Sequence, residues 1–338
     1  MKTDKKVIRQ LILKSVTEHP KDMVKVVTKK LGISRQGVNR HVQSLIREGI
    51  LSGKGKTKGI EYSLKPIATK NLEFTITQSL EEDRIWRDEI APNLIDLPPN
   101  VREIAQYGFM EIVSNAIHHS EGEKIYIGLR KTFAQINISI RDDGTGIFHK
   151  IKEGTGFEDL WQAAFELSKG RLTTDETGHT GMNIFFTSRI FDKFGIMSGG
   201  LCLIHKSDDT WVLEEGKTPP SGTYVGMVLN TNSEKTVKEL YDKYALPGED
   251  AGFLRTHIPL AIARYGDEQL ISRSQAKRVL RRIDQFKEII MDFKEISFIG
   301  QAFADEIFRV FQERNPEIKL HYVNAQDTIE RIIQSVLK

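Results

Sequence analysis

Apolar side chains recur at intervals of one helical turn in the first part of the chain. The stretch VIRQLILKSVTEH starts the pattern, and Pro20 follows it. A second run, DMVKVVTKKLG, ends at Gly32, and a third, SRQGVNRHVQSLIREGI, begins at Ser34, a residue type that caps helices. The apolar ends of LSGKGKTKGIEYSL enclose a Gly/Lys-rich tip, which is typical of a β-hairpin. The order predicts three helices and a hairpin within residues 1–66.

Farther along, apolar and polar residues alternate as in half-buried strands, in NLEFTITQ, KIYIGLR and AQINISIRDD. Beyond about residue 250, strand-like runs (FLRTHIPLAI, KEIIMDF, KLHYVNA) alternate with helix-like runs (SRSQAKRVLRRIDQF, GQAFADEIFRVFQERN, TIERIIQSVL). This order is typical of an α/β sandwich. The patterns predict a multidomain chain of α+β and α/β architecture, with domains at 1–66, 67–235 and 250–338.

The charge distribution separates the first domain from the rest. The whole chain has a net charge of +3, but residues 1–66 hold 16 Lys+Arg against 5 Asp+Glu, which gives +11. The remainder holds 49 − 16 = 33 basic and 46 − 5 = 41 acidic residues, which gives −8. A small basic module on an acidic body indicates nucleic-acid binding. The alternative is a lysine-rich face that only meets solvent.

The third predicted helix places polar side chains opposite its apolar stripe. These candidates for contact with phosphates and base edges are Arg35, Gln36, Asn39 and Arg40, and the hairpin tip adds Lys54, Lys56 and Lys58. Together, LGISRQGVNRHVQSLIREGIL and the hairpin resemble a winged helix-turn-helix. The resemblance implies a recognition helix in the DNA major groove and a wing on the backbone. Some winged helices bind only proteins; the charge favours DNA.

The stretch EIVSNAIHH brings a carboxylate, an amide and an imidazole onto one helical face, because Glu111, Asn115 and His119 are each four residues apart. By itself such a face is most often solvated. Downstream, an alternating strand ends in DDGTGI, where Asp142 can accept a hydrogen bond from an exocyclic amine such as that of adenine. Gly144 and Gly146 let the backbone turn sharply and approach a ligand.

Two further motifs complete the set. In TGHTGMNIFF, Gly178 and Gly181 open an apolar helix, an arrangement that aims backbone N–H groups at phosphate. In SGTYVGMVL, Thr223 precedes a strand. Four motifs in this order, over residues 70–232, resemble the GHKL ATP-binding superfamily of gyrase, MutL, heat-shock chaperones, histidine kinases and anti-sigma kinases. Asn183 departs from the pattern, since the second glycine motif often has Gly there.

The GHKL resemblance implies ATP and Mg²⁺ as cofactors. It implies that Asn115 ligates Mg²⁺, that Asp142 accepts the adenine amine with support from Thr223, and that Gly144, Gly146, Gly178 and Gly181 give backbone approach. It implies a lid over about Phe148 to Thr180. Glu111 becomes a candidate general base for slow ATP hydrolysis. His119 matches the anti-sigma-kinase pattern, and no phosphoacceptor-histidine helix is evident upstream, so a histidine kinase is not expected.

The C-terminal stretch IIMDFKEISFIGQAFADEIFRVF resembles the STAS domain, and in particular the STAS-like domain that follows some GHKL domains. Phosphorylated STAS proteins have Ser at the start of the second helix, where this chain has Gly300, Gln301 and Ala302. A kinase and its substrate within one chain are therefore not expected. The resemblance implies a domain that binds a protein partner or dimerises; the alternative is a simple structural cap.

The remaining features of the sequence concern the location of the protein in the cell. The chain has one cysteine, Cys202, no apolar signal-peptide core, and no apolar run near the roughly 18–20 residues that span a bilayer. We expect a cytoplasmic homodimer without a membrane partner, acting as an ATP-controlled DNA-binding transcriptional regulator. The alternatives are an anti-sigma-type serine kinase, and an ATP-driven DNA clamp or stress-defence protein.

Overall fold

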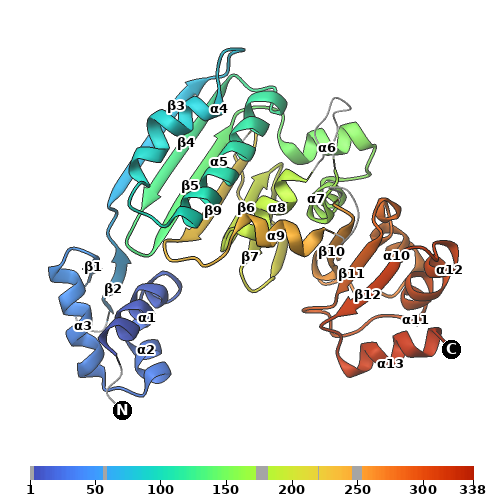
Figure 1. The fold of residues 1–338 in the computed structure, drawn as a ribbon. Coiled ribbons are helices and arrows are strands. Elements are labelled where there is room, and N and C mark those ends of the chain that lie inside the picture. The colour runs from blue at the N-terminus through green and yellow to red at the C-terminus, as the bar shows by residue number, and fades with distance from the viewer. Residues whose placement is uncertain (1–3, 56–58, 173–181, 220, 246–252) are drawn as a thin grey trace.

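The computed structural model describes residues 4–55, 59–172, 182–219, 221–245 and 253–338, in an N-terminal unit, a large central sheet and a C-terminal unit (Figure 1). The helices are α1 (Lys5–Glu18), α2 (Met23–Leu31), α3 (Arg35–Arg47), α4 (Glu82–Ile85), α5 (Pro99–His119), α6 (Ile147–Thr155), α7 (Leu160–Lys169), α8 (Asn183–Ile190), α9 (Val237–Tyr244), α10 (Arg273–Val279), α11 (Gln301–Ala304), α12 (Gln312–Arg314) and α13 (Asp327–Val336). The strands are β1 (Leu51–Lys54), β2 (Glu61–Leu64), β3 (Ala68–Thr75), β4 (Lys124–Lys131), β5 (Gln135–Asp142), β6 (Lys193–Ser198), β7 (Leu201–Lys206), β8 (Trp211–Glu215), β9 (Tyr224–Asn230), β10 (Arg255–Pro259), β11 (Glu288–Asp292) and β12 (Lys319–Val323).

The N-terminal unit contains the three predicted helices and the predicted hairpin, around a core of its own. Ser34 caps α3, since its hydroxyl accepts a hydrogen bond from the N–H of Gly37 at 3.1 Å. Val38, Val42 and Leu45 on α3 are fully buried. Strands β1 and β2 pair antiparallel, with Leu51 opposite Leu64. The unit therefore has a hydrophobic core distinct from that of the central sheet.

The central sheet has seven strands in the order β3-β4-β5-β9-β6-β7-β8, and every neighbouring pair is antiparallel. Burial alternates strictly along β4, β5 and β9, because the described helices pack on one face of these strands and not on the other. Helix α5 lies across β5 and β9 on the covered face, beside α8 and α9 (Figure 1). The sheet is therefore a two-layer structure with an open second face.

The C-terminal unit is a three-stranded parallel sheet, β10-β11-β12, joined by helices as the alternating pattern predicts. The predicted helix over residues 272–286 is shorter: α10 ends at Val279, and residues 283–285 form a separate turn. Helix α11 continues through a π-helical stretch, Asp305–Phe311, into α12. Apolar residues of the central and C-terminal units form one continuous core.

The segment expected to be a lid is largely helical. Residues 147–155 and 160–169 form α6 and α7, and every residue from Gln162 to Lys169 is buried. Helix α7 packs against β10 of the C-terminal unit. This half of the expected lid is thus a domain interface, and residues 173–181 lie outside the described part of the chain. None of the helices in the described residues has the length and apolar character needed to cross a bilayer.

Candidate functional site

Five of the predicted site residues line one cavity between α5, the end of β5 and the start of β9. They are Asn115, His119, Asp142, Gly146 and Thr223. Most of the remaining wall is apolar and comes from α5, β5, α6, α7, α8, β9 and the segment that follows α7: Ile112, Ala116, Ile140, Ile147, Ile151, Leu167, Leu172, Ile184 and Val225. A cavity with apolar walls and a few convergent polar groups is the usual form of a small-molecule site.

Helix α5 presents Asn115 and His119 to the cavity through its four-residue spacing. The helix is fixed from behind, because Val101, Ile104, Phe109 and Val113 are fully buried against the sheet. Gly108 allows α5 to pack closely on Phe191, since a Cβ at this position would lie 2.3 Å from a ring carbon of Phe191. The buried apolar face of α5 thus fixes the position of its polar face.

Asp142 is buried and oriented by the backbone. Its Oδ1 accepts hydrogen bonds from the N–H of Gly144 at 3.0 Å and of Thr223 at 3.2 Å. No described residue donates to its Oδ2, so this oxygen can accept a hydrogen bond from a ligand. Burial raises the pKa of Asp142, although the two backbone N–H groups oppose the shift. Thr223 is held in turn, because its Oγ1 accepts a hydrogen bond from the N–H of Ile147 at 2.9 Å.

The two glycines of DDGTGI serve the packing of the turn. A Cβ on Gly144 would lie 1.9 Å from the carbonyl oxygen of Ser120, at the end of α5. Gly146 has a φ of +92°, and a Cβ there would lie 2.6 Å from the Ser198 hydroxyl. Gly146 lines the cavity, whereas Gly144 lies behind it. The motif therefore shapes the cavity by letting the turn dock on α5 and β6.

Glu111 does not line the cavity itself. It lies one turn of α5 before Asn115 and close to the side chain of Asn183, which does line the cavity. Burial raises the pKa of Glu111, and the interaction with the Asn183 side chain opposes that shift. A carboxylate with a raised pKa beside a cavity is a candidate general base. Asn183, at the start of α8, thus takes part in the polar edge of the site.

One cation on the cavity wall was not predicted from the sequence. Lys150 on α6 lines the cavity, and its ammonium group donates a hydrogen bond to Glu121 at 2.8 Å. It follows DDGTGI by one helical turn, which is the signal that could have identified it. Gly178 and Gly181 lie outside the described residues.

The basic candidates of the N-terminal unit lie on its surface. Arg35, Gln36 and Arg40 are exposed on α3 and Asn39 is half-buried, on the side opposite the buried valines. Lys54 is exposed at the end of β1, while Lys56 and Lys58 lie outside the described residues. The structure therefore places the described candidates on one helix face and on the hairpin beside it.

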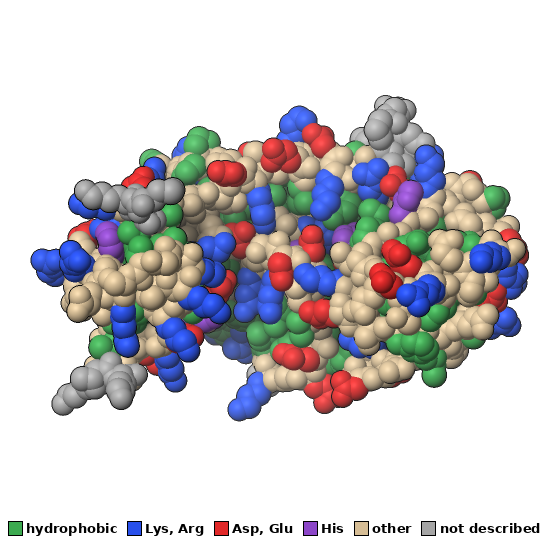
Figure 2. Space-filling view, turned by 90° about the horizontal axis from the view of Figure 1, so that it is seen from below, with side chains coloured by type: hydrophobic (Ala, Val, Ile, Leu, Met, Phe, Trp, Pro, Cys, Tyr) green, Lys and Arg blue, Asp and Glu red, His purple; other side chains and the backbone are tan. Residues whose placement is uncertain are grey.

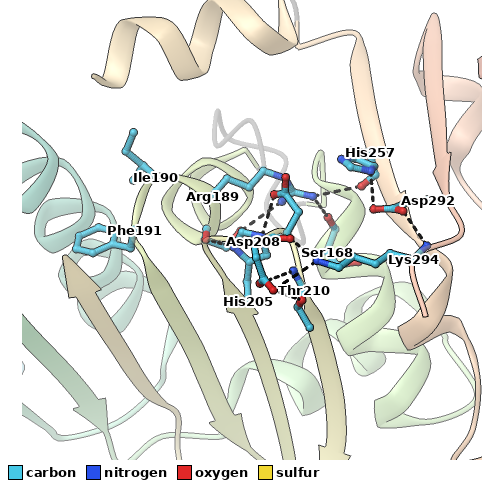
Figure 3. Close-up of polar contacts among 12 residues, drawn as sticks. Ser168, Arg189, Ile190, Phe191, His205, Asp208, Thr210, His257, Asp292 and Lys294 are labelled. Carbon is cyan, nitrogen blue, oxygen red and sulfur yellow. Dashed lines mark hydrogen bonds and ion pairs between the residues drawn. The ribbon is translucent and has the colours of Figure 1, made fainter. Parts of the chain in front are cut away.

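A buried polar network joins the central sheet to the C-terminal unit (Figure 3). Arg189 of α8 donates to the carbonyl oxygens of Ser168 at 3.1 Å and His257 at 3.2 Å. Lys169 of α7 donates to Glu166 at 2.7 Å and to the carbonyl oxygens of Val279 and Arg281. Helices α7 and α8 also contribute Leu167, Asn183 and Ile184 to the cavity. The same two helices therefore face the cavity and the C-terminal unit.

Comparison with known proteins identifies one segment. A family model described as "STAS-like domain of unknown function (DUF4325)" matches residues 275–330, which run from α10 through β11 and β12 into α13. The prediction of a STAS-like domain is thereby confirmed for residues 275–330 of this mixed α and β, multidomain chain. No curated protein matches the chain.

Proposed function

We propose that the chain is a DNA-binding regulator controlled by ATP bound in the cavity beside α5. The observation that carries the proposal is the convergence of Asn115, His119, Asp142 and Thr223 on one apolar cavity, although they lie far apart in the sequence. This order of elements fits the GHKL type of ATP site, and the antiparallel sheet with helices on one face is compatible with it.

The adenine ring would occupy the apolar part of the cavity. Its exocyclic amine would donate to Oδ2 of Asp142, the oxygen that the backbone N–H groups leave for a ligand. Thr223 supports this contact by holding the turn that carries Asp142 and Gly146. Ile140 and Val225 on neighbouring strands would pack against the ring.

The phosphates would lie toward Asn115, His119 and Lys150. Magnesium would depend on the side-chain oxygen of Asn115 together with phosphate oxygens, because the described residues contain no group of three acidic, His or Cys ligands. Glu111 would accept a proton from attacking water at the edge of the cavity, with Asn183 holding its carboxyl group.

The N-terminal unit would supply DNA binding as a winged helix. Its charge of +11, the polar face of α3 and the Lys-bearing hairpin support this role. Arg130 of β4 donates to the carbonyl oxygen of Leu64 at 2.7 Å, so the unit is attached directly to the sheet that forms the cavity. The STAS-like unit would respond to nucleotide through α7 and α8, and would bind a protein partner or a second copy.

The test is DNA binding by the full chain with and without Mg·ATP. A pool of random duplexes is selected for binding and the enriched sequence is footprinted. We expect a short protected site whose affinity changes on addition of Mg·ATP, because a ligand that prefers one conformation shifts the equilibrium. Binding with no preferred sequence would favour the clamp alternative, and affinity that does not respond to Mg·ATP would contradict control by ATP.

A further inference from the structure

The open face of the central sheet carries a transverse groove. Register places four small residues side by side across β4, β5, β9 and β6: Gly128, Ser139, Gly226 and Gly195. All four line one depression of about 380 Å³. Gly195 leaves the floor open, since the nearest atoms to a Cβ there would be 3.8 Å away. We call this set the glycine row.

Cations border the glycine row on one side. Two residues away from the glycine row, the strand register aligns a second set of side chains across the sheet. This set consists of Arg130, Asn137, Val228 and Lys193, and Lys206 on β7 lies opposite Lys193. We call Arg130, Lys193 and Lys206 the basic row. Lys193 and Lys206 are exposed, and neither has an acidic partner among the described residues. Their charges are therefore available to a ligand.

Planar and polarisable side chains border the other side. Register aligns Tyr126, Arg141, Tyr224 and Met197, which we call the aromatic row. The guanidinium group of Arg141 lies 5.5 Å from the centre of the Tyr126 ring. The two rows are four residues apart along each strand, or about 14 Å. The ring of Tyr224 reaches from the aromatic row onto the glycine row, since its Cε1 lies 3.3 Å from where a Cβ on Gly226 would stand.

We infer that this groove binds single-stranded nucleic acid, with phosphates along the basic row and bases on the aromatic row. Proteins that bind single strands combine a basic track with aromatic platforms on which bases stack. A duplex fits less well, because its bases are already stacked and cannot reach Tyr126 and Tyr224. The inference rests on the proposed DNA-binding role of the N-terminal unit.

The position of the groove supports this occupant. Arg130 contacts Leu64 at the end of the hairpin, so the basic row begins where the N-terminal unit is attached. Viewed from the side of that unit, Lys and Arg side chains gather around the hollow between it and the rest of the molecule (Figure 2).

The test uses the full chain and a fluorescein-labelled oligo(dT) of about 20 nucleotides, followed by anisotropy over a range of salt concentrations. The double variant Lys193→Gln/Lys206→Gln should lower the slope of log affinity against log salt by about 1.4, at roughly 0.7 per lost phosphate contact. Tyr126→Leu and Tyr224→Leu should each weaken binding about fivefold or more. Gly195→Leu should fill the groove and weaken binding without a change of charge.

The matched control is Lys277→Gln/Lys319→Gln, which removes two exposed charges from the C-terminal unit and should leave the affinity unchanged. Thermal melting shows that each variant is folded. The inference is overturned if the wild-type chain does not bind oligo(dT), or if binding is lost in Arg35→Ala/Arg40→Ala but kept in all the groove variants. Duplex binding and ATP binding are measured separately. A negative result for either one can therefore be distinguished from a loss of oligo(dT) binding in the groove.

Discussion

Arg189 of α8 and His257 of β10 are joined by a hydrogen bond of 3.2 Å from the guanidinium group to the carbonyl oxygen, across the boundary between the central sheet and the STAS-like unit. Arg189 is buried and its guanidinium carbon lies 3.5 Å from the centre of the Phe185 ring. A buried cation whose donors reach carbonyl groups of both units fixes their relative position. The boundary is thus a well-packed interface, and the helices α7 and α8 contribute both to it and to the cavity wall.

The Lys169–Glu166 pair at this interface gives the first prediction. Both side chains are about 2% exposed, and their charged atoms lie 2.7 Å apart. Lys169→Met should destabilise the chain by about 3–5 kcal/mol, because Glu166 remains buried without its partner. Lys169→Met/Glu166→Leu should recover part of that loss. Urea unfolding of the three proteins measures the effect, and a single variant as stable as wild type would contradict the assigned contact.

Glu111→Gln should separate nucleotide binding from hydrolysis. A general base contributes about 10²- to 10⁴-fold, so the turnover of ATP should fall by at least roughly a hundredfold while its affinity stays within about threefold. Phosphate release and calorimetry measure the two quantities. Unchanged turnover would remove Glu111 from the mechanism.

The same variant should change the dependence of stability on pH. Burial raises the pKa of Glu111 above 4.5, so the ionised form costs stability in the folded chain. Stability contributed by protonation is present below pH 4.5 and is lost as the pH rises through the raised pKa. Glu111→Gln should therefore melt at a higher temperature than wild type at pH 8, with the difference vanishing near pH 4. A lower melting temperature at pH 8 would show that the carboxylate stabilises the fold.

Arg35→Ala/Arg40→Ala on α3 should weaken duplex binding and reduce its salt slope by about 1.8 if both contact phosphate, at roughly 0.9 per contact. Lys54→Ala should reduce the slope by about half as much and alter sequence preference little, because a wing contacts the backbone. Electrophoretic shifts at several salt concentrations measure both. Lys319→Ala serves as the control, and equal slopes for all proteins would exclude the α3 surface.

Local patterns predicted the parts of the site that lie on single elements. Asn115 and His119 share a helical face because they are four residues apart, and Asp142 is the last alternating position of a strand. The three helices and hairpin of the N-terminal unit have equally local causes, such as the Ser34 cap and the left-handed Gly32. These features need no knowledge of distant contacts.

Contacts between distant segments could not be predicted. Lys169 and Arg189 belong to residue types that are usually exposed, and part of their hydrogen bonding depends on carbonyl groups of the distant C-terminal unit, such as those of Val279 and His257. Helix α7 was expected in a lid because nothing local reveals that β10 covers it. Gly144 was assigned to ligand approach, whereas the nearby Ser120 carbonyl explains it, since two segments 24 residues apart meet there.

The central claim is that Asp142 recognises adenine, and calorimetric titration of Asp142→Asn tests it most directly. With the amide oxygen accepting from Gly144 and Thr223, the amide NH₂ would face the adenine amine, donor against donor. We predict that the affinity for Mg·ATP falls about 10- to 100-fold, while inosine triphosphate, whose ring carbonyl can accept from the new NH₂, binds the variant at least as well as it binds wild type. An unchanged affinity of Asp142→Asn for Mg·ATP would contradict the account.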